Sequence, residues 1–475
     1  MTLRYGSWVG AVAFLAACGS QPQVDGQPER VESAARTQQA VQWQPTAALV
    51  TQHVDWHSKP CSLAGQSLNG QVGIGRRCTK TGEDFLNWHR SYIQRLRADF
   101  EAQGLTHDIK PWYAVPPEIK ADPRWSASME AANNAMKTMV NPNTGARFAS
   151  LDEFGRFIEG SFHGVLHAIS ASLWGVTDPD VGNFMSPRST LFFKIHGYID
   201  WLAERFAKGD FNWDGKSDLV VRGTDTAAIL LMNDGVQTSR VAMPSAGAGE
   251  CGFTIGATMD YDYTGSTDII WQGRSCNRVV AWTMSGTRPS MVTVGLVRTT
   301  ELPSQNLQML GSGDFDADRR PDLAYQTATD DVLVALLKGT TQRGTMTLDI
   351  PAGHRPQLIA DVNDDGTPDV IVLQIGSNPR VYKVQYVLPG GTLGQLATLG
   401  GVNTNTFEVP SAIGRYHLNG SSADIAVSQF RGAPDGAIMP WSYPLTGIAA
   451  GVPSYGPRVS STTGLQLNED IRGPR

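Results

Sequence analysis

The feature that most restricts how this chain can fold is an acidic sequence unit that recurs in its second half. Each copy has aspartate at its first and ninth positions and asparagine or aspartate at its third. The clear copies begin at Asp210, Asp260, Asp314 and Asp361, which lie 50, 54 and 47 residues apart, and a degenerate fifth copy runs from Gly414 to Asp424. This period, with β-branched runs after the unit, is typical of one blade of a β-propeller. We therefore expect residues 208–475 to form an all-β propeller of about five blades.

The oxygen-bearing side chains of these units have the spacing of ligands for a hard cation. Oxygens at positions 1, 3, 5 and 9 of a tight turn suit Ca²⁺, which we expect to hold the loops in shape. The units resemble the FG-GAP/VCBS repeats of integrin-type propellers. The expected ligands are Asp210, Asn212, Asp214, Asp218, Asp260, Asp262, Asp268, Asp314, Asp316, Asp318, Asp322, Asp361, Asn363, Asp365 and Asp369. Thr264 and Arg319 weaken the second and third copies, and an acidic turn without an ion is the alternative for each copy.

The first half of the chain carries two histidine constellations of the same shape. Six of the nine histidines belong to them, namely His53, His57 and His89 in the first and His163, His167 and His196 in the second. Histidines at i and i+4 share one face of a helix, so each pair can hold one ion that a third histidine completes. Apolar spacing predicts helices near 47–57, 85–100, 157–173 and 191–206, which match a four-helix bundle with metals in its core. Neutral imidazoles suit copper, zinc, iron or nickel.

Three motifs connect this half of the chain to a known family. Phe85-Leu-Asn-Trp-His-Arg-Ser-Tyr resembles the FLPWHRxY motif of tyrosinases, catechol oxidases and molluscan haemocyanins. His163-Gly-Val-Leu-His167 is similar to the paired histidines of their second copper site, and the segment 185–200 to the one that supplies its third ligand. The resemblance implies a copper domain over residues 42–207 with two copper ions, each held by three histidines. It also implies oxidation of o-diphenols or related phenolics to quinones with dioxygen.

The chain departs from the family at its first copper site. Lys80 stands where family members carry a histidine, and His53 is the substitute that we expect, on spacing alone. The rival is a site with only His57 and His89, either defective or completed by Cys78.

The chain also departs from the family beside its second copper site. Gly164 replaces an asparagine that, in the family, orients a water molecule together with a nearby glutamate. Glu159 is the candidate for the acidic role, so we place Glu159 and Gly164 at the catalytic position. The resemblance with this change makes hydroxylation of monophenols doubtful. Arg90 and Asp200 flank ligands and are expected to pair and fix the helices, with a solvated pair as the alternative.

The N-terminus predicts export. The apolar run that ends in Leu-Ala-Ala-Cys is too short to span a membrane, and it resembles a lipoprotein signal peptide over residues 1–17 with Cys18 as the lipidated residue. Residues 18–41 are polar and are expected to be a flexible tether, which implies an exported protein anchored to the membrane, most simply the outer membrane. An ordinary secretory signal is the alternative.

The remaining cysteines can form disulfides in an exported protein. Sequence proximity favours Cys61 with Cys78 and Cys251 with Cys276, although four cysteines allow three pairings.

Charge and composition exclude some functions and leave others open. A net charge of −6 without a basic block gives no support for nucleic-acid binding. The first interpretation is an exported copper oxidase of phenolic compounds. One alternative is a degenerate or oxygen-binding copper domain on a surface adhesion protein whose propeller binds a protein or glycan. Another is a binuclear metal hydrolase, which the absence of a bridging carboxylate disfavours.

Overall fold

The computed structural model describes residues 44–58, 81–105, 108–212 and most of 214–399; beyond residue 399 it describes only the strands. The gaps within 214–399 are 223–226, 234–235, 244–251, 274–277, 286–287, 299–306, 340 and 378–379. The predicted signal peptide, Cys18, the tether and Cys61, Cys78, Cys251 and Cys276 lie outside the described residues. Residues Gln42–Arg475 form one compact unit.

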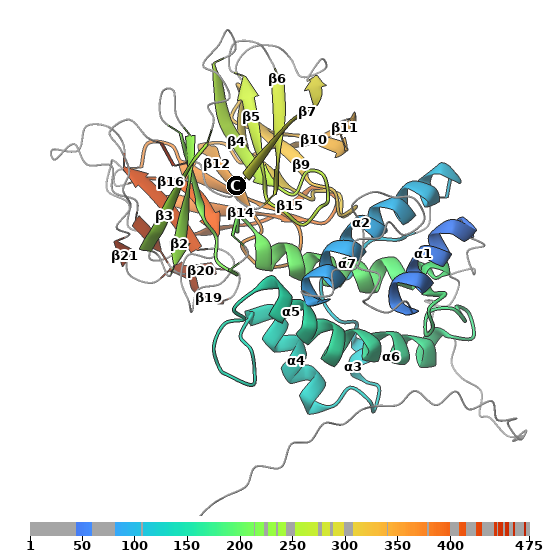
Figure 1. Ribbon diagram of the computed structural model, residues 1–475. Coiled ribbons are helices and arrows are strands. Elements are labelled where there is room, and N and C mark those ends of the chain that lie inside the picture. Colours follow the sequence, from blue (N-terminus) through green and yellow to red (C-terminus); the bar gives the residue numbers. More distant parts are fainter. Residues whose placement is uncertain are drawn as a thin grey trace, which may run out of the picture. The chain divides into compact units, whose positions relative to one another are not determined.

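The helices occupy the first part of this unit (Figure 1). They are α1 (Ala47–Ser58), α2 (Thr81–Ala102), α3 (Pro117–Lys120), α4 (Ala127–Thr138), α5 (Leu151–Ile158), the π-helical turn η3 (Glu159–His163), α6 (Gly164–Trp174), the 3₁₀ turn η4 (Ser186–Arg188) and α7 (Thr190–Ala207). Among the described residues, no helix combines the length and the apolarity that a membrane span requires.

Local sequence explains where the helices start and cross. Ser150 begins α5 because its hydroxyl accepts a hydrogen bond from the backbone N–H of Glu153, a side-chain cap three residues ahead. Helices α2 and α5 cross at Gly82 and Gly155, where a Cβ on Gly155 would lie 2.0 Å from the backbone oxygen of Gly82. The crossing therefore requires glycine, and it sets α2 against the continuous helical segment that carries His163.

The strands form small antiparallel sheets. In order across each sheet they are β22 (Asp470–Ile471), β1 (Leu219–Arg222), β2 (Ala227–Asn233) and β3 (Val236–Met243); β4 (Phe253–Met259), β5 (Asp268–Gly273), β6 (Arg278–Ser285) and β7 (Arg288–Arg298); β11 (Thr341–Leu348), β10 (Val332–Lys338), β9 (Asp322–Gln326) and β8 (Gln308–Gly313); β12 (His354–Ala360), β13 (Asp369–Gln374), β14 (Tyr382–Leu388) and β15 (Thr392–Thr398); β16 (Glu408–Gly414), β17 (Asp424–Gln429), β18 (Trp441–Tyr443) and β21 (Val459–Ser460); and the pair β19 (Leu445–Ala449) and β20 (Val452–Tyr455).

Each of the four clear acidic units leads directly into a strand, as the β-branched runs after the units predicted. The second, third and fourth units are the turns β4–β5, β8–β9 and β12–β13, and the first unit joins α7 to β1. Apolar residues on both faces of these strands pack between neighbouring sheets, as Leu310 and Val332 of one sheet do against Ile359 and Val370 of the next. The buried residues thus form clusters between sheets.

The predicted architecture, a mainly α four-helix bundle followed by a propeller of about five blades, is wrong. In the described residues the helical part has α1 to α7 with π and 3₁₀ turns, and the strands form separate small sheets of which none closes on itself. The histidine spacing predicts only the helices that carry ligands, and α3, α4 and α5 carry none. The repeat length predicts how many residues one small sheet takes up, but it contains no information on how several sheets are arranged.

Candidate metal centre

The first histidine group comes from two helices that are separate in sequence. His53 and His57 lie one turn apart on α1, and His89 lies on α2. One ring nitrogen from each lies within 4.8 Å of the other two. The structure therefore brings together the three residues that the spacing predicted, including His53, for which no family motif exists.

Backbone carbonyls fix the ring orientation of two members of this group. Nδ1 of His53 lies 2.9 Å from the carbonyl oxygen of Phe184, and Nδ1 of His89 lies 2.8 Å from that of Phe85. A carbonyl oxygen only accepts, so each Nδ1 carries the proton and each Nε2 presents a lone pair. These two Nε2 atoms are buried and have no hydrogen-bond partner among the described residues. A buried unpartnered acceptor is costly unless something binds it, and a metal ion is the ligand that suits a bare imidazole nitrogen.

The second group has tighter geometry. His163 ends the π turn η3, His167 lies on α6 and His196 on α7. Nε2 of His196 lies 3.2 Å from Nε2 of His163 and 3.2 Å from Nε2 of His167. Nitrogen ligands that lie about 2.0 Å from a tetrahedral metal are separated by about 3.3 Å, so these nitrogens have the spacing of one coordination sphere. The π turn widens the helix at this point, as such turns often do at functional sites.

The two groups face each other. The rings of His89 and His196 stack with centroids 4.6 Å apart and an interplanar angle of 10°. The rings of His57 and His163 also stack, at 6.3 Å. Two ions held by these groups would therefore be neighbours in one binuclear centre.

Burial keeps these imidazoles neutral. The pKa of His53, His89, His163 and His196 lies well below the ordinary value of 6.5, chiefly because burial disfavours the charged form and secondly because other imidazoles are close. Burial also lowers the pKa of His167 to about 4. Neutral imidazole is the form that binds metal. Within the described residues, neither group includes a carboxylate, which favours copper, zinc, iron or nickel over magnesium or calcium.

Aromatic rings cover the centre on its inner side and leave one edge open. Phe192 is fully buried and packs on the ring of His196 with centroids 4.0 Å apart. Phe184 is 55% exposed and stacks on His57 at 5.3 Å. The solvent edge is therefore at Phe184, while Phe192 belongs to the core. The sequence contained no signal for Phe184, which lies in the loop between α6 and η4.

The two predicted catalytic positions flank the π turn. Glu159 is its first residue and is half-buried, and Gly164 follows its last residue. A Cβ on Gly164 would meet no atom within 4 Å. Position 164 therefore offers open space where the family carries an asparagine.

The acidic units have one hydrogen-bonding scheme in common. The ninth aspartate of each is completely buried, and each of its carboxylate oxygens accepts a bond from a backbone N–H at 2.7–3.0 Å. The first aspartate accepts bonds from the N–H groups of the fifth and sixth residues at 2.6–3.2 Å. These residues are Asp218, Asp268, Asp322 and Asp369 at the ninth position and Asp210, Asp260, Asp314 and Asp361 at the first. The carboxylates thus stabilise the turn and its two strands directly.

The predicted calcium ligands at the third and fifth positions have different contacts in the four loops. Carboxylate oxygens lie within 4.8 Å of one another in Asp260, Asp262 and Asp268 of the second unit and in Asp314, Asp316 and Asp322 of the third. In the third unit, however, Arg343 pairs with Asp316 and lies 2.9 Å from Asp318. In the first and fourth units, the amides of Asn212 and Asn363 donate to Asp214 and Asp365.

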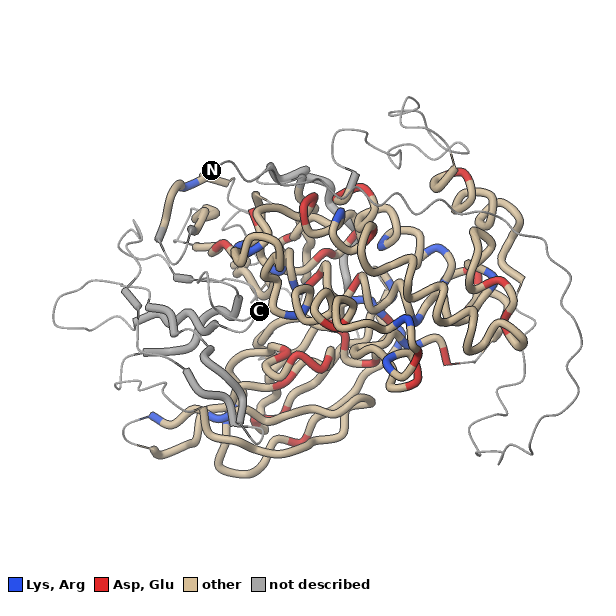
Figure 2. Tube along the Cα trace, turned by 90° about the horizontal axis from the view of Figure 1, so that it is seen from below, with Lys and Arg blue, Asp and Glu red and all other residues tan. Residues whose placement is uncertain are grey.

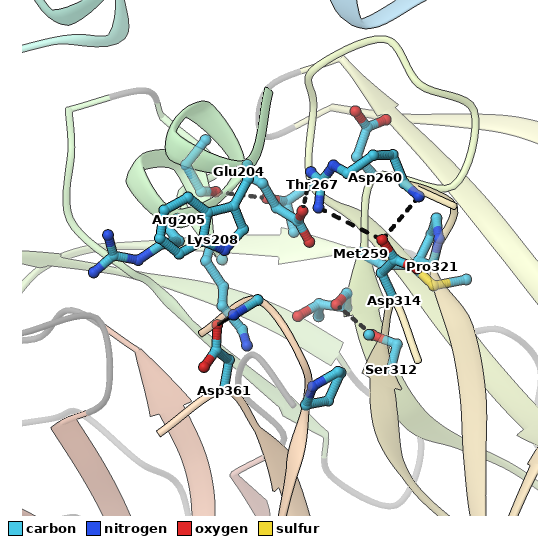
Figure 3. A pocket seen from close by; sticks show the side chains of 18 of the residues that line it. Glu204, Arg205, Lys208, Met259, Asp260, Thr267, Ser312, Asp314, Pro321 and Asp361 are labelled. Atoms are coloured by element: carbon cyan, nitrogen blue, oxygen red, sulfur yellow. Dashed lines mark hydrogen bonds and ion pairs between the residues drawn. The ribbon is translucent and has the colours of Figure 1, made fainter. Parts of the chain in front are cut away.

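Charges of both signs are intermingled in the described part of the chain (Figure 2). Where α2 and α7 contact the acidic loops, Arg90 pairs with Asp200 at 2.7 Å, as we expected, and also with Asp260 at 2.9 Å. Arg205 of α7 pairs with Asp364 of the fourth unit at 2.6 Å. A cavity of about 80 Å³ lies here, with Arg90, Arg205 and Asp260 among the residues that line it (Figure 3).

Comparisons with known proteins give no family. No protein-family model and no curated protein matches the chain. Among solved structures, it is similar to a protein of unknown function from Bacteroides caccae, with 12% sequence identity, a TM-score of 0.27 and coverage of 51% of this chain and 72% of that chain. A likeness of this size carries no argument, so the histidine centre itself is the basis for assigning a function.

Proposed function

We propose that the two histidine groups hold two copper ions and that the chain oxidises o-diphenols or related phenolics to quinones with dioxygen. The observation that carries this proposal is the meeting of two buried all-imidazole groups, with His89 stacked on His196 at 4.6 Å. Copper bound there would supply the electron-transfer chemistry with dioxygen. The Nε2 atom of His53, buried and without a partner in the described residues, supports three ligands at the first site over the rival with only His57 and His89.

The residues of the chain hold the imidazoles of the site in a fixed orientation. The carbonyls of Phe184 and Phe85 keep the Nδ1 protons in place, so the Nε2 lone pairs need no reorganisation. Phe184 offers an exposed ring beside His57, where an aromatic substrate would stack. A diphenol loses two electrons and two protons as it becomes a quinone, and dioxygen, after two such turnovers, leaves as two molecules of water.

Copper content and turnover test this proposal. We expect two copper ions per chain by elemental analysis, and oxygen consumption with catechol that depends on copper. Zinc or iron bound in preference to copper would contradict the proposal. Copper without catechol turnover would favour an oxygen-binding domain instead.

The open space at Gly164 predicts the preference between substrates. Without an amide at this position, Glu159 lacks the partner with which the family orients the water that removes the phenol proton, so diphenols should be oxidised in preference to monophenols. Gly164→Asn should raise the ratio of monophenol to diphenol turnover by about tenfold. Gly160→Asn is the matched control, because position 160 lies in the same π turn and a Cβ there would also meet no atom within 4 Å. An equal change in both variants would contradict the role assigned to position 164.

We also infer that the protein is exported and anchored through a lipid on Cys18. The support is the apolar run and the Leu-Ala-Ala-Cys sequence of the N-terminus. Labelled palmitate should be incorporated in cells and should be lost in Cys18→Ser. Incorporation that survives this substitution would contradict the anchor.

A further inference from the structure

A network of buried ion pairs lies outside the metal centre and joins α2 and α7 to the acidic loops. Its shared acceptor is Asp200, one turn of α7 after His196. Arg90, the residue after His89, donates from Nε to one carboxylate oxygen of Asp200 at 2.7 Å. The Arg319 guanidinium donates to the other oxygen, at 2.9 Å from Nε and with a second nitrogen at 2.8 Å. One carboxylate therefore holds an arginine from a ligand-bearing helix and an arginine from the third acidic loop.

Each arginine makes a further ion pair beyond Asp200. Arg90 reaches from α2 to Asp260 of the second loop at 2.9 Å, and Arg319 reaches from the third loop to Glu204 of α7 at 2.5 Å. Figure 3 shows Glu204 and Asp260 beside the same pocket. The side chains of Arg319 and Asp200 are only 3% and 5% exposed, so this pair is weakly screened, and the planar guanidinium fixes its direction.

The backbone of Arg319 indicates that its side chain has a function beyond the loop. Arg319 stands at the sixth position of its unit, where the other three have Gly215, Gly265 and Gly366 with φ of 81°, 88° and 88°. Arg319 adopts a φ of 61°, a left-handed conformation that favours glycine. A residue that a turn disfavours persists when its side chain makes compensating contacts, and those of Arg319 lead to α7.

We propose that Arg319 is a positioning residue of the metal centre, which through Asp200 and Glu204 fixes the rotation of α7 and hence the placement of His196. Arg90 shares the Asp200 carboxylate and couples the placement of His89 to the same contact. The inference rests on the metal centre of the proposed function, and it extends that centre to a loop of the β part. It names no catalytic role for Arg319, which touches no histidine of either group.

The test separates positioning from simple stabilisation. Arg319→Gly restores the glycine that the other units carry, so the loop itself should tolerate it. We expect the affinity for copper, titrated alone as Cu(I) against a chromophoric chelator, to fall by about tenfold, the low end of the range for loss of a direct contact to a metal ligand, because Arg319 acts through α7. Arg319→Lys should restore part of this loss. Arg343→Gln is the matched control, because Arg343 pairs with Asp316 and Asp318 of the same loop and these pairs do not involve α7.

The outcomes distinguish this inference from the proposed function. Copper affinity in Arg319→Gly equal to that of the unaltered protein, whatever its melting temperature, would overturn the inference. If Arg319→Gly does not fold, Glu204→Gln removes one partner at a half-exposed position and should give a smaller loss of affinity in the same direction. An unaltered protein that binds copper but does not oxidise catechol would contradict the proposed function and leave the affinity test intact. An unaltered protein that binds no copper would overturn both.

Discussion

The histidine centre and the acidic loops each gather side chains of one chemical kind, yet they differ in how far those side chains are already satisfied. In the centre, Nε2 atoms of His53 and His89 are buried without a partner in the described residues. In the loops, both oxygens of aspartates such as Asp218 and Asp369 accept backbone N–H groups. A cluster with unused lone pairs is arranged for an external ligand, whereas a cluster with paired oxygens stabilises its own fold. Residue type and spacing alone do not distinguish these two situations.

Loss of a histidine that belongs to the tighter group should have the largest effect. His196 contributes the nitrogen that lies 3.2 Å from those of both His163 and His167. We expect His196→Ala to lose copper from the second site and to lower catechol turnover by at least about a thousandfold. His354→Ala is the matched control, because His354 lies on β12 and belongs to neither group. If His196→Ala kept copper at both sites, the histidine groups would not be arranged for an external metal ion.

Acid should destabilise the metal-free protein through the same centre. The folded-state pKa of His53, His89, His163 and His196 lies well below 6.5, chiefly because of burial, whereas the unfolded chain takes up protons near 6.5. The unfolded state then binds more protons, so the free energy of unfolding falls as the pH drops from 6.5 towards the folded-state values, which for His167 is about 4.

Each buried imidazole should lower the free energy of unfolding by about 1.4 kcal/mol per pH unit in this window. Denaturant unfolding of the metal-free protein at pH 7 and pH 5 measures the effect. A flat profile would show that these imidazoles are not held neutral.

Removal of a saturated aspartate should destabilise the fold without added metal. Asp369→Ala leaves the buried N–H groups of Val362 and Val387 without their acceptor. We expect a loss of about 3 kcal/mol in the free energy of unfolding, measured in the presence of a chelator. The control is Asp349→Ala, since Asp349 is exposed. If the two variants had the same free energy of unfolding in the presence of a chelator, the loop carboxylates would stabilise the fold only by binding a metal ion.

Calcium should have the smallest effect of the four. Because backbone N–H groups already bond both oxygens of the ninth aspartates, we expect the addition of Ca²⁺ to raise the melting temperature by about 2–4 °C, equivalent to about 1 kcal/mol. Unfolding by chelator alone would contradict this expectation and would make the loops true metal-dependent elements.

The sequence predicted which histidines lie together better than it predicted their setting. The i, i+4 spacing and the third histidine were enough to group His163, His167 and His196, and spacing alone grouped His53 with His57 and His89. The β-branched runs after the repeat unit predicted the strand that follows each acidic turn, but the propeller predicted from the repeat length is wrong. The arrangement of the sheets and the additional helices could not be predicted, because they depend on packing between segments that share no pattern. Arg319 left a detectable signal, an arginine where the other copies have glycine, but its partners on α7 emerge only in three dimensions.

One pairing in the first sheet has a consequence for the order of folding. Strand β22 pairs with β1, so that Ile471 lies opposite Val221. The first sheet is therefore completed by a strand from a distant part of the chain, and closing so long a loop is entropically slow. Until then β1 has an unsatisfied edge that other chains can pair with. Before β22 is in place, the edge of β1 is a point at which two chains can associate, and pairing with β22 removes that exposed edge.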